Sequence, residues 1–126
     1  MPESRAGRVA YYCVPMLFCL AVHWIALKTW FRADDFAWLG LRFEIHSPHD
    51  LLDVLFGLRA QGTIRTISER LYFLSFSSLF GMNALPLRLW TFLTQFANIA
   101  LLIAITRRIT GSALAGFIAP ILWSAT

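Results

Sequence analysis

Charged residues are scarce in this sequence of 126 residues. They make up 14% of it, whereas apolar residues make up 58% and the mean hydropathy is +0.62. A typical soluble domain is about a quarter charged, and a domain of this length has too little interior to bury such an apolar excess. The composition excludes an intrinsically disordered chain and argues against a water-soluble monomer, so we expect a membrane protein.

Cysteine is scarce as well. The sequence contains only Cys13 and Cys19, six residues apart in one apolar run. In a helix this spacing directs the two side chains to nearly opposite faces. We therefore expect neither an internal disulfide nor a shared metal, and interpret both as small apolar residues that fill space.

Long apolar runs are what the sequence has instead. Residues 9–27 contain no charged side chain, and at about 1.5 Å per residue such a helix crosses the hydrocarbon core of a bilayer. Pro15 is tolerated in a membrane helix. No small-x-small cleavage site follows, so we interpret the run as an uncleaved transmembrane helix and not as a signal peptide.

The sequence predicts an all-α, polytopic membrane protein with two full spans and an incomplete third. The predicted order is a cytoplasmic head (1–8), a first span (9–27), an outer loop with surface or re-entrant helices (28–86), a second span (87–106), a cytoplasmic turn (107–112) and the start of a third span (113–126). The last segment is too short to cross a bilayer. We therefore expect further transmembrane helices in a longer chain.

The basic residues predict the orientation. Lysine and arginine accumulate on the cytoplasmic side of membranes, and arginines flank both spans at Arg5, Arg8, Arg107 and Arg108. An even number of crossings must separate the two pairs, so the short apolar segment 71–80 is expected not to cross. The amino terminus is then cytoplasmic, and the net charge of +4 reflects topology and not a nucleic-acid partner.

The outer loop carries helix signals of its own. Ser47 to Asp50, with proline at the first helical position, and Thr66 to Glu69 each match a capping box. Gly111 and Ser112 are expected to end one helix and to begin the next. Leucines follow Asp50 at helical spacing, which predicts an amphipathic helix that lies on the membrane or packs on other helices.

Asp34 and Asp35 are the candidate catalytic residues. They stand shortly after the first span, at the expected level of the outer lipid headgroups. One interpretation is that Asp34 caps a helix beginning at Asp35 and that both carboxylates are simply solvated. The other is that one of them accepts a proton from an attacking hydroxyl or helps to hold a divalent cation. The residues alone leave both interpretations open.

Arg32, Arg70 and Arg88 are the candidate phosphate-binding residues, because guanidinium groups bind phosphate in a bidentate manner. Each could instead be an anchor at headgroup level. His46 and His49 match no standard metal spacing, so the sequence identifies neither a metal nor a cofactor. His23, Gln95 and Asn98 lie within the apolar runs, and we expect interhelical polar contacts for them.

The order of these features resembles the amino-terminal part of GT-C class membrane glycosyltransferases, in the branch of protein O-mannosyltransferases and bacterial lipid-linked sugar transferases. The resemblance rests on FRADDFAWLGL after the first span and on the segment RLYFLSFSSLFGMNALPLRLWTFLTQFANIALLIAITRRITGSALAGFIAPILW. It implies a polyprenyl-phosphate sugar donor, an acceptor hydroxyl on the outer face of the bacterial inner membrane, and a catalytic carboxylate at Asp34 or Asp35. Members of the class are several times longer. The alternative is a small, non-enzymatic membrane accessory or assembly protein.

Overall fold

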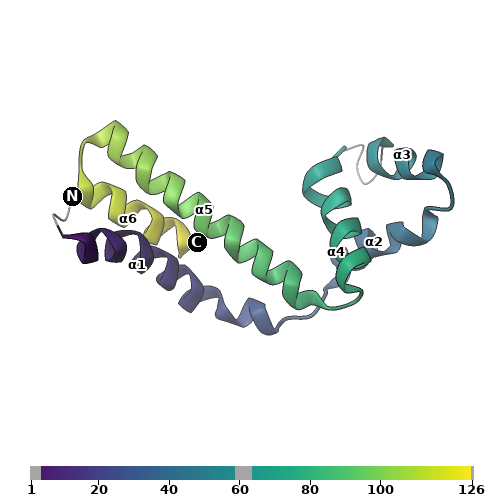
Figure 1. Ribbon diagram of the computed structural model, residues 1–126, viewed down its shortest axis with the longest axis horizontal. Coiled ribbons are helices and arrows are strands. Elements are labelled where there is room, and N and C mark those ends of the chain that lie inside the picture. Colours follow the sequence, from purple (N-terminus) through teal and green to yellow (C-terminus); the bar gives the residue numbers. More distant parts are fainter. Residues whose placement is uncertain (1–3, 59–63, 126) are drawn as a thin grey trace. The chain divides into compact units, whose positions relative to one another are not determined.

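The computed structural model describes residues 4–58 and 64–125, apart from the side chain of Asp34, and these residues form helices and no strand (Figure 1). The predicted all-α class is therefore confirmed. The chain divides into two compact units. Residues 1–28 and 88–126 form the bundle unit, and residues 29–87 form the connecting unit.

Three helices build the bundle unit. Helix α1 (Arg5–His23) continues into the 3-10 helix η1 (Trp24–Lys28), and α5 (Ala84–Thr110) contributes its residues from 88 onward. Gly111 follows α5 with a positive φ of 67°, and Ser112 Oγ accepts a hydrogen bond of 3.2 Å from Ala115 N at the start of α6 (Ala113–Ser124). The predicted helix end at Gly111 and the predicted cap at Ser112 are confirmed.

Helices α1 and α6 run parallel to each other. Tyr11 Oη donates to the carbonyl oxygen of Ala113 at 2.7 Å, and twelve residues later His23 Nε2 contacts the carbonyl oxygen of Ser124 at 2.8 Å. The interhelical contact predicted for His23 is thus present. Helix α5 runs the opposite way, and its Ile99 and Ile103 are fully buried against α1 in the core of the unit.

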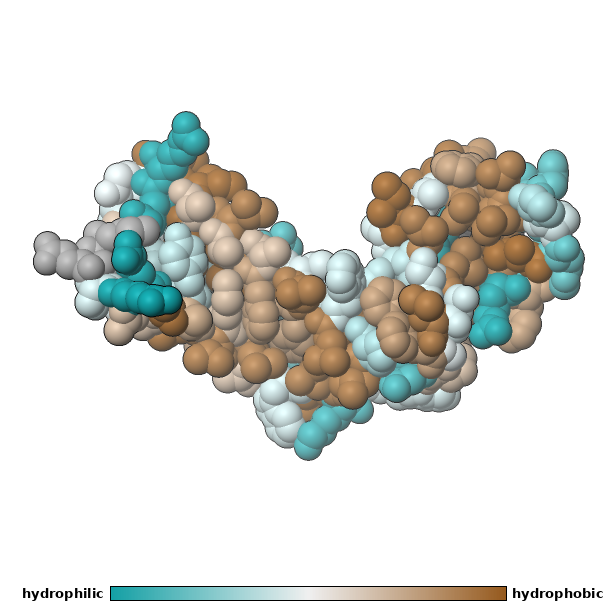
Figure 2. Space-filling model, in the orientation of Figure 1, coloured by the Kyte–Doolittle hydropathy of each residue, from teal (hydrophilic) through white to brown (hydrophobic). Residues whose placement is uncertain are grey.

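The arginines that flank the apolar runs lie at one end of the bundle unit. Arg5 and Arg8 are in the first turn of α1, and Arg107 and Arg108 are in the last turns of α5. The Arg107 guanidinium lies 5.6 Å from the ring centre of Tyr11 on α1. Figure 2 shows hydrophilic residues gathered at this end and hydrophobic residues over the body of the bundle. Both pairs of arginines therefore lie at the same end of this unit.

Two helices are long and apolar enough to cross a membrane. They are Arg5–Lys28, with 24 residues, and Ala84–Thr110, with 27 residues; in each, only 17% of the most apolar stretch is buried inside the protein. Both extend beyond the predicted spans of 9–27 and 87–106, since the helices continue into the flanking residues at both ends. Helix α6 is also apolar, but its 12 residues are fewer than the roughly 20 that a membrane span needs.

The connecting unit consists of short helices. They are α2 (Ala33–Gly40), the 3-10 helix η2 (Leu41–Glu44), α3 (Pro48–Phe56), the π-helix η3 (Thr66–Leu71) and α4 (Tyr72–Phe80). Phe31, Leu39 and Phe73 form its buried core together with the first turn of α5. Tyr72 Oη donates to the carbonyl oxygen of Leu87 at 3.0 Å, which fastens α4 to that turn.

One of the two predicted capping boxes is present. Ser47 Oγ accepts a hydrogen bond of 3.2 Å from Asp50 N, and Pro48 occupies the first position of α3, as predicted. The capping box predicted at Thr66 is wrong. Arg65 precedes η3 without a side-chain cap, and Thr66 Oγ1 donates instead to the carbonyl oxygen of Leu55 at 2.8 Å. The Thr66 hydroxyl therefore bonds to the backbone of α3 and not to the first turn of its own helix.

Candidate functional site

The two candidate catalytic aspartates lie in the first turn of α2. The helix begins at Ala33, and Arg32 is its extended N-cap residue, with φ −117° and ψ 172°. The interpretation that Asp34 caps a helix beginning at Asp35 is therefore wrong. Asp35 Oδ2 accepts a hydrogen bond of 3.0 Å from Arg32 N, so Asp35 is the carboxylate that caps the helix. The side chain of Asp34 lies outside the described residues.

This position suits a negative charge. The first turn of a helix leaves backbone N–H groups unpaired and carries the positive end of the helix dipole. An ionised carboxylate there accepts hydrogen bonds from these groups. Asp35 is half-buried and Arg32 is exposed. A base at Asp34 or Asp35 and a phosphate ligand at Arg32 both stay predictions.

Arg70 holds two helices of the connecting unit together. It is 1% exposed, and its Nη1 donates to the carbonyl oxygens of Val54, Leu55 and Gly57 at 3.1, 2.9 and 2.6 Å. These carbonyls end α3, where backbone acceptors lack partners within the helix. This contact was not predictable from the sequence, because it joins residues 13 to 16 positions apart. Phosphate binding by Arg70 stays a prediction.

Arg88 belongs to the bundle unit and not to the unit that carries Asp35. Arg88 lines a cavity of about 370 Å³ within the bundle unit. Four further polar residues line the same cavity: His23, Thr91, Gln95 and Ser124. The cavity lies where α1 and α6 end and α5 begins, which is the end opposite to Arg107. A half-open cavity of this size, lined mainly by apolar surface with a few polar groups, is of the kind that holds small ligands.

Apolar side chains complete the walls of the cavity. Cys19 on α1, Phe92 on α5 and Trp123 on α6 line it. Cys19 is buried and Cys13 is exposed, and both are free thiols, in agreement with the predicted opposite faces. The cavity combines one cation, several hydrogen-bonding groups and an aromatic wall. Sequence reasoning missed it because its lining comes from three helices.

The polar residues in the middle of α5 differ from expectation. Gln95 lines the cavity, and its Oε1 is buried without a hydrogen-bond partner among the residues that the structure describes. Asn98 is exposed on another face of the helix. The prediction of interhelical polar contacts is wrong for both, since neither side chain forms such a hydrogen bond in the described part of the chain.

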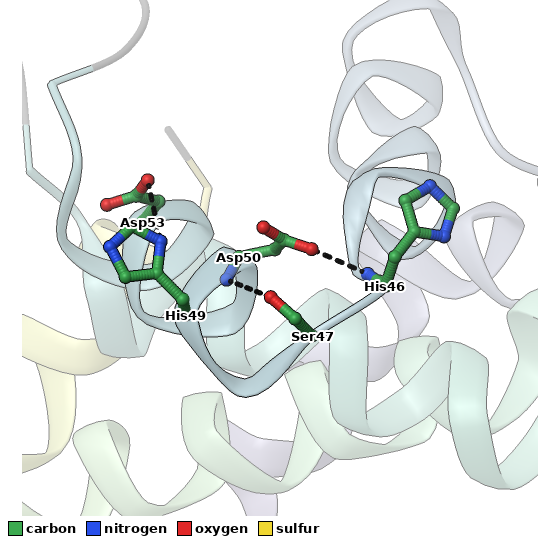
Figure 3. A network of polar contacts seen from close by, with 5 residues as sticks. All are labelled: His46, Ser47, His49, Asp50 and Asp53. Atoms are coloured by element: carbon green, nitrogen blue, oxygen red, sulfur yellow. Dashed lines mark hydrogen bonds and ion pairs between the residues drawn. The ribbon is translucent and has the colours of Figure 1, made fainter.

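The histidines of the connecting unit take part in the cap of α3 (Figure 3). Asp50 Oδ2 accepts a hydrogen bond of 3.0 Å from His46 N. This bond, followed by that with Ser47, lowers the pKa of Asp50 below its ordinary value of 3.8. His49 Nδ1 lies 3.6 Å from Asp53 Oδ2, with both side chains exposed. In the described ranges no three metal-ligating side chains come together.

Each unit therefore has its own candidate features: the capping carboxylate of Asp35 and the buried guanidinium of Arg70 in the connecting unit, and the cavity lined by Arg88 in the bundle unit. The cavity has the clearest binding character, because it offers a cation inside an apolar bundle. No protein-family model matches the sequence, and neither a curated protein nor a solved structure matches it.

Proposed function

We propose that the chain is part of an integral membrane glycosyltransferase that moves a sugar from a polyprenyl-phosphate donor to an acceptor hydroxyl on the outer face of the inner (plasma) membrane. The amino terminus is cytoplasmic in this proposal. Two helices of span length, with most of their apolar surface outside the protein core, support a membrane location. A hydrocarbon environment removes the cost of exposing that surface to water.

The cavity at Arg88 carries the proposal. An arginine within an apolar helix is costly in a bilayer and marks a place where an anion or a polar pathway is needed. Arg88 is half-buried, near the start of α5, and lines a cavity rather than the outer surface of the helix. The phosphate of a lipid carrier supplies such an anion at the depth of the headgroups. The guanidinium group of Arg88 can hold two phosphate oxygens at once.

The aspartates of α2 supply the chemistry in this proposal. The carboxylate of Asp34 or Asp35 takes the proton of the acceptor hydroxyl while that oxygen attacks the anomeric carbon of the sugar. The bond between the anomeric carbon and the phosphate oxygen breaks, and the polyprenyl phosphate leaves with the electron pair. Arg32, which is exposed next to these aspartates in the same unit, can compensate the charge of the leaving phosphate.

Sugar transfer in membranes that contain the protein tests the proposal. Labelled sugar is supplied on a polyprenyl phosphate, and Asp34→Asn, Asp35→Asn and the double variant are compared with the wild-type protein. We expect the loss of the base to slow transfer by about 10² or more. Asp53→Asn is the matched control, because Asp53 is exposed on α3.

Unchanged transfer in the double variant contradicts the catalytic role of the aspartates. Arg88→Gln should weaken binding of the donor, and unchanged binding contradicts the phosphate site. If the wild-type protein neither transfers the sugar nor binds the donor, the alternative of a non-enzymatic membrane accessory protein is favoured.

A further inference from the structure

Two side chains of α5 line the cavity two helical turns apart. Arg88 and Gln95 are separated by seven residues, which places them on the same face of the helix. Both line the cavity within the bundle unit. A ligand that reaches from one to the other meets a cation first and an amide deeper in the bundle.

The polar neighbours of Gln95 on α1 and α6 are already engaged. His23 Nε2 contacts the carbonyl oxygen of Ser124, and Ser124 Oγ donates to the carbonyl oxygen of Pro120 at 2.7 Å. Gln95 Oε1, in contrast, is a buried acceptor with no hydrogen-bond partner in the described part of the chain. A buried acceptor without a donor costs free energy.

A small movement brings this acceptor to the cavity. The last torsion of a glutamine side chain is broad and roughly two-fold, so rotation about it exchanges the amide oxygen and nitrogen at little cost. The oxygen can then face the cavity, where a ligand or a water molecule can supply the missing donor. The donor must lie within reach of the group that binds Arg88.

We propose that the cavity binds a lipid phosphodiester whose alcohol carries a free hydroxyl, with the phosphate on Arg88 and the hydroxyl on Gln95. This inference rests on the proposed function for the lipid-phosphate site and adds the group that Gln95 recognises. Polyprenyl-phosphate sugars and phosphatidylglycerol share this chemistry. The cavity of about 370 Å³ lies within the usual size of small-ligand sites, and the aromatic wall at Trp123 suits the boundary between headgroup and chain.

Two phospholipids with the same phosphodiester charge, one with hydroxyls on its headgroup alcohol and one without, test the inference. The whole purified protein is titrated in detergent with short-chain phosphatidylglycerol and with short-chain phosphatidylmethanol, which has the same phosphodiester charge and no hydroxyl. Binding is measured by native mass spectrometry. We expect the wild-type protein to bind phosphatidylglycerol about tenfold more tightly, the effect of one hydrogen bond in a buried site.

The variants separate the two contacts. Gln95→Leu should abolish the preference and leave phosphatidylmethanol binding unchanged, whereas Arg88→Gln should weaken both lipids. Asn98→Leu is the matched control, because it removes an amide from an exposed face of the same helix and should change neither affinity. If the wild-type protein binds the two lipids equally well, the inference is overturned, whatever the variants do. A preference that survives Gln95→Leu, or an equal loss for both lipids, overturns it too.

A second pair of ligands identifies the source of the lipid. A short prenyl-phosphate glucose is compared with the corresponding prenyl methyl phosphate. A preference for the sugar that depends on Gln95 supports both the inference and the proposed function. If phosphatidylglycerol is preferred but neither prenyl compound binds, the inference stands and the glycosyltransferase proposal fails. If both prenyl compounds bind equally well, the inference fails and the donor site remains.

Discussion

The hydroxyl of Tyr11 on α1 donates a hydrogen bond of 2.7 Å to the carbonyl oxygen of Ala113, the first residue of α6. Together with the contact between His23 and Ser124 it aligns the two helices in parallel. Three residues after Ala113, the buried Gly116 leaves room for the Tyr11 ring and for the side chain of Arg107. This close approach fixes the end of the bundle that carries the arginines.

Gly116→Ala should destabilise the bundle unit. A Cβ at this position would meet the Cγ of Arg107 and would lie 2.6 Å from Tyr11 Oη, so the hydrogen bond to Ala113 has to shift. We expect a loss of about 1–3 kcal/mol, the usual cost of overpacking. Thermal unfolding in detergent measures it.

The matched control is Gly40→Ala, because nothing lies within 4 Å of a Cβ placed there. Alanine in the last turn of α2 should be neutral or slightly stabilising, since alanine loses less backbone entropy than glycine in a helix. Equal effects of the two substitutions would refute the packing described at Gly116.

Arg70→Met should loosen the contact between α3 and η3. The substitution keeps much of the volume and removes the donor to three carbonyl oxygens at the end of α3. We expect a loss of about 2–3 kcal/mol for hydrogen bonds from a buried charged group, seen as faster hydrogen exchange in α3. In the control, Arg65→Met, the lost ion pair with Glu69 lies at the surface and should cost about 0.5 kcal/mol or less. Unchanged hydrogen exchange in Arg70→Met would mean that the hydrogen bonds from Arg70 to α3 do not stabilise the unit.

Signals between near neighbours were predictable from the sequence, and contacts between distant segments were not. Pro48, Gly111 and Ser112 act within one helical turn, so their residue types were sufficient to place helix ends. Thr66 matched a cap of the same kind, but its hydroxyl is bound to Leu55, eleven residues earlier. Composition together with the long apolar runs indicated the helical class and the two apolar helices.

The candidate site was predictable only in part. Arg88 was singled out because its guanidinium group could bind a phosphate. Its surroundings were not predictable, because the cavity needs His23 from α1, Gln95 from α5 and Ser124 from α6. Asp35 was singled out as a carboxylate near the membrane, but its bond to Arg32 N depends on a helix that begins two residues earlier than expected.

The cap of α3 should respond to acid through Asp50. Hydrogen bonds from His46 N and Ser47 lower the pKa of Asp50 in the folded protein. A lowered pKa means that its contribution to stability is present above the unfolded value of about 3.8 and is lost as the pH falls through the folded pKa. NMR titration of the carboxyl carbon should give a value below 3.8. At neutral pH, the α3 amides should be better protected from hydrogen exchange in the wild-type protein than in Asp50→Asn. This difference should vanish in acid. A value at or above the ordinary one would contradict the hydrogen bonds of Figure 3.

The central claim is that the two long apolar helices cross a bilayer, with the arginines inside and the connecting unit outside. Single cysteines at His49 and Thr110 test it most directly, in a protein whose Cys13 and Cys19 are replaced by alanine. Both positions are exposed, one on α3 and one at the end of α5. In intact cells whose inner membrane can be reached from outside, a maleimide that cannot cross membranes should label His49→Cys. The same reagent should label Thr110→Cys only after lysis. Labelling of both positions from outside, or of Thr110→Cys alone, would contradict the topology and the membrane site built on it.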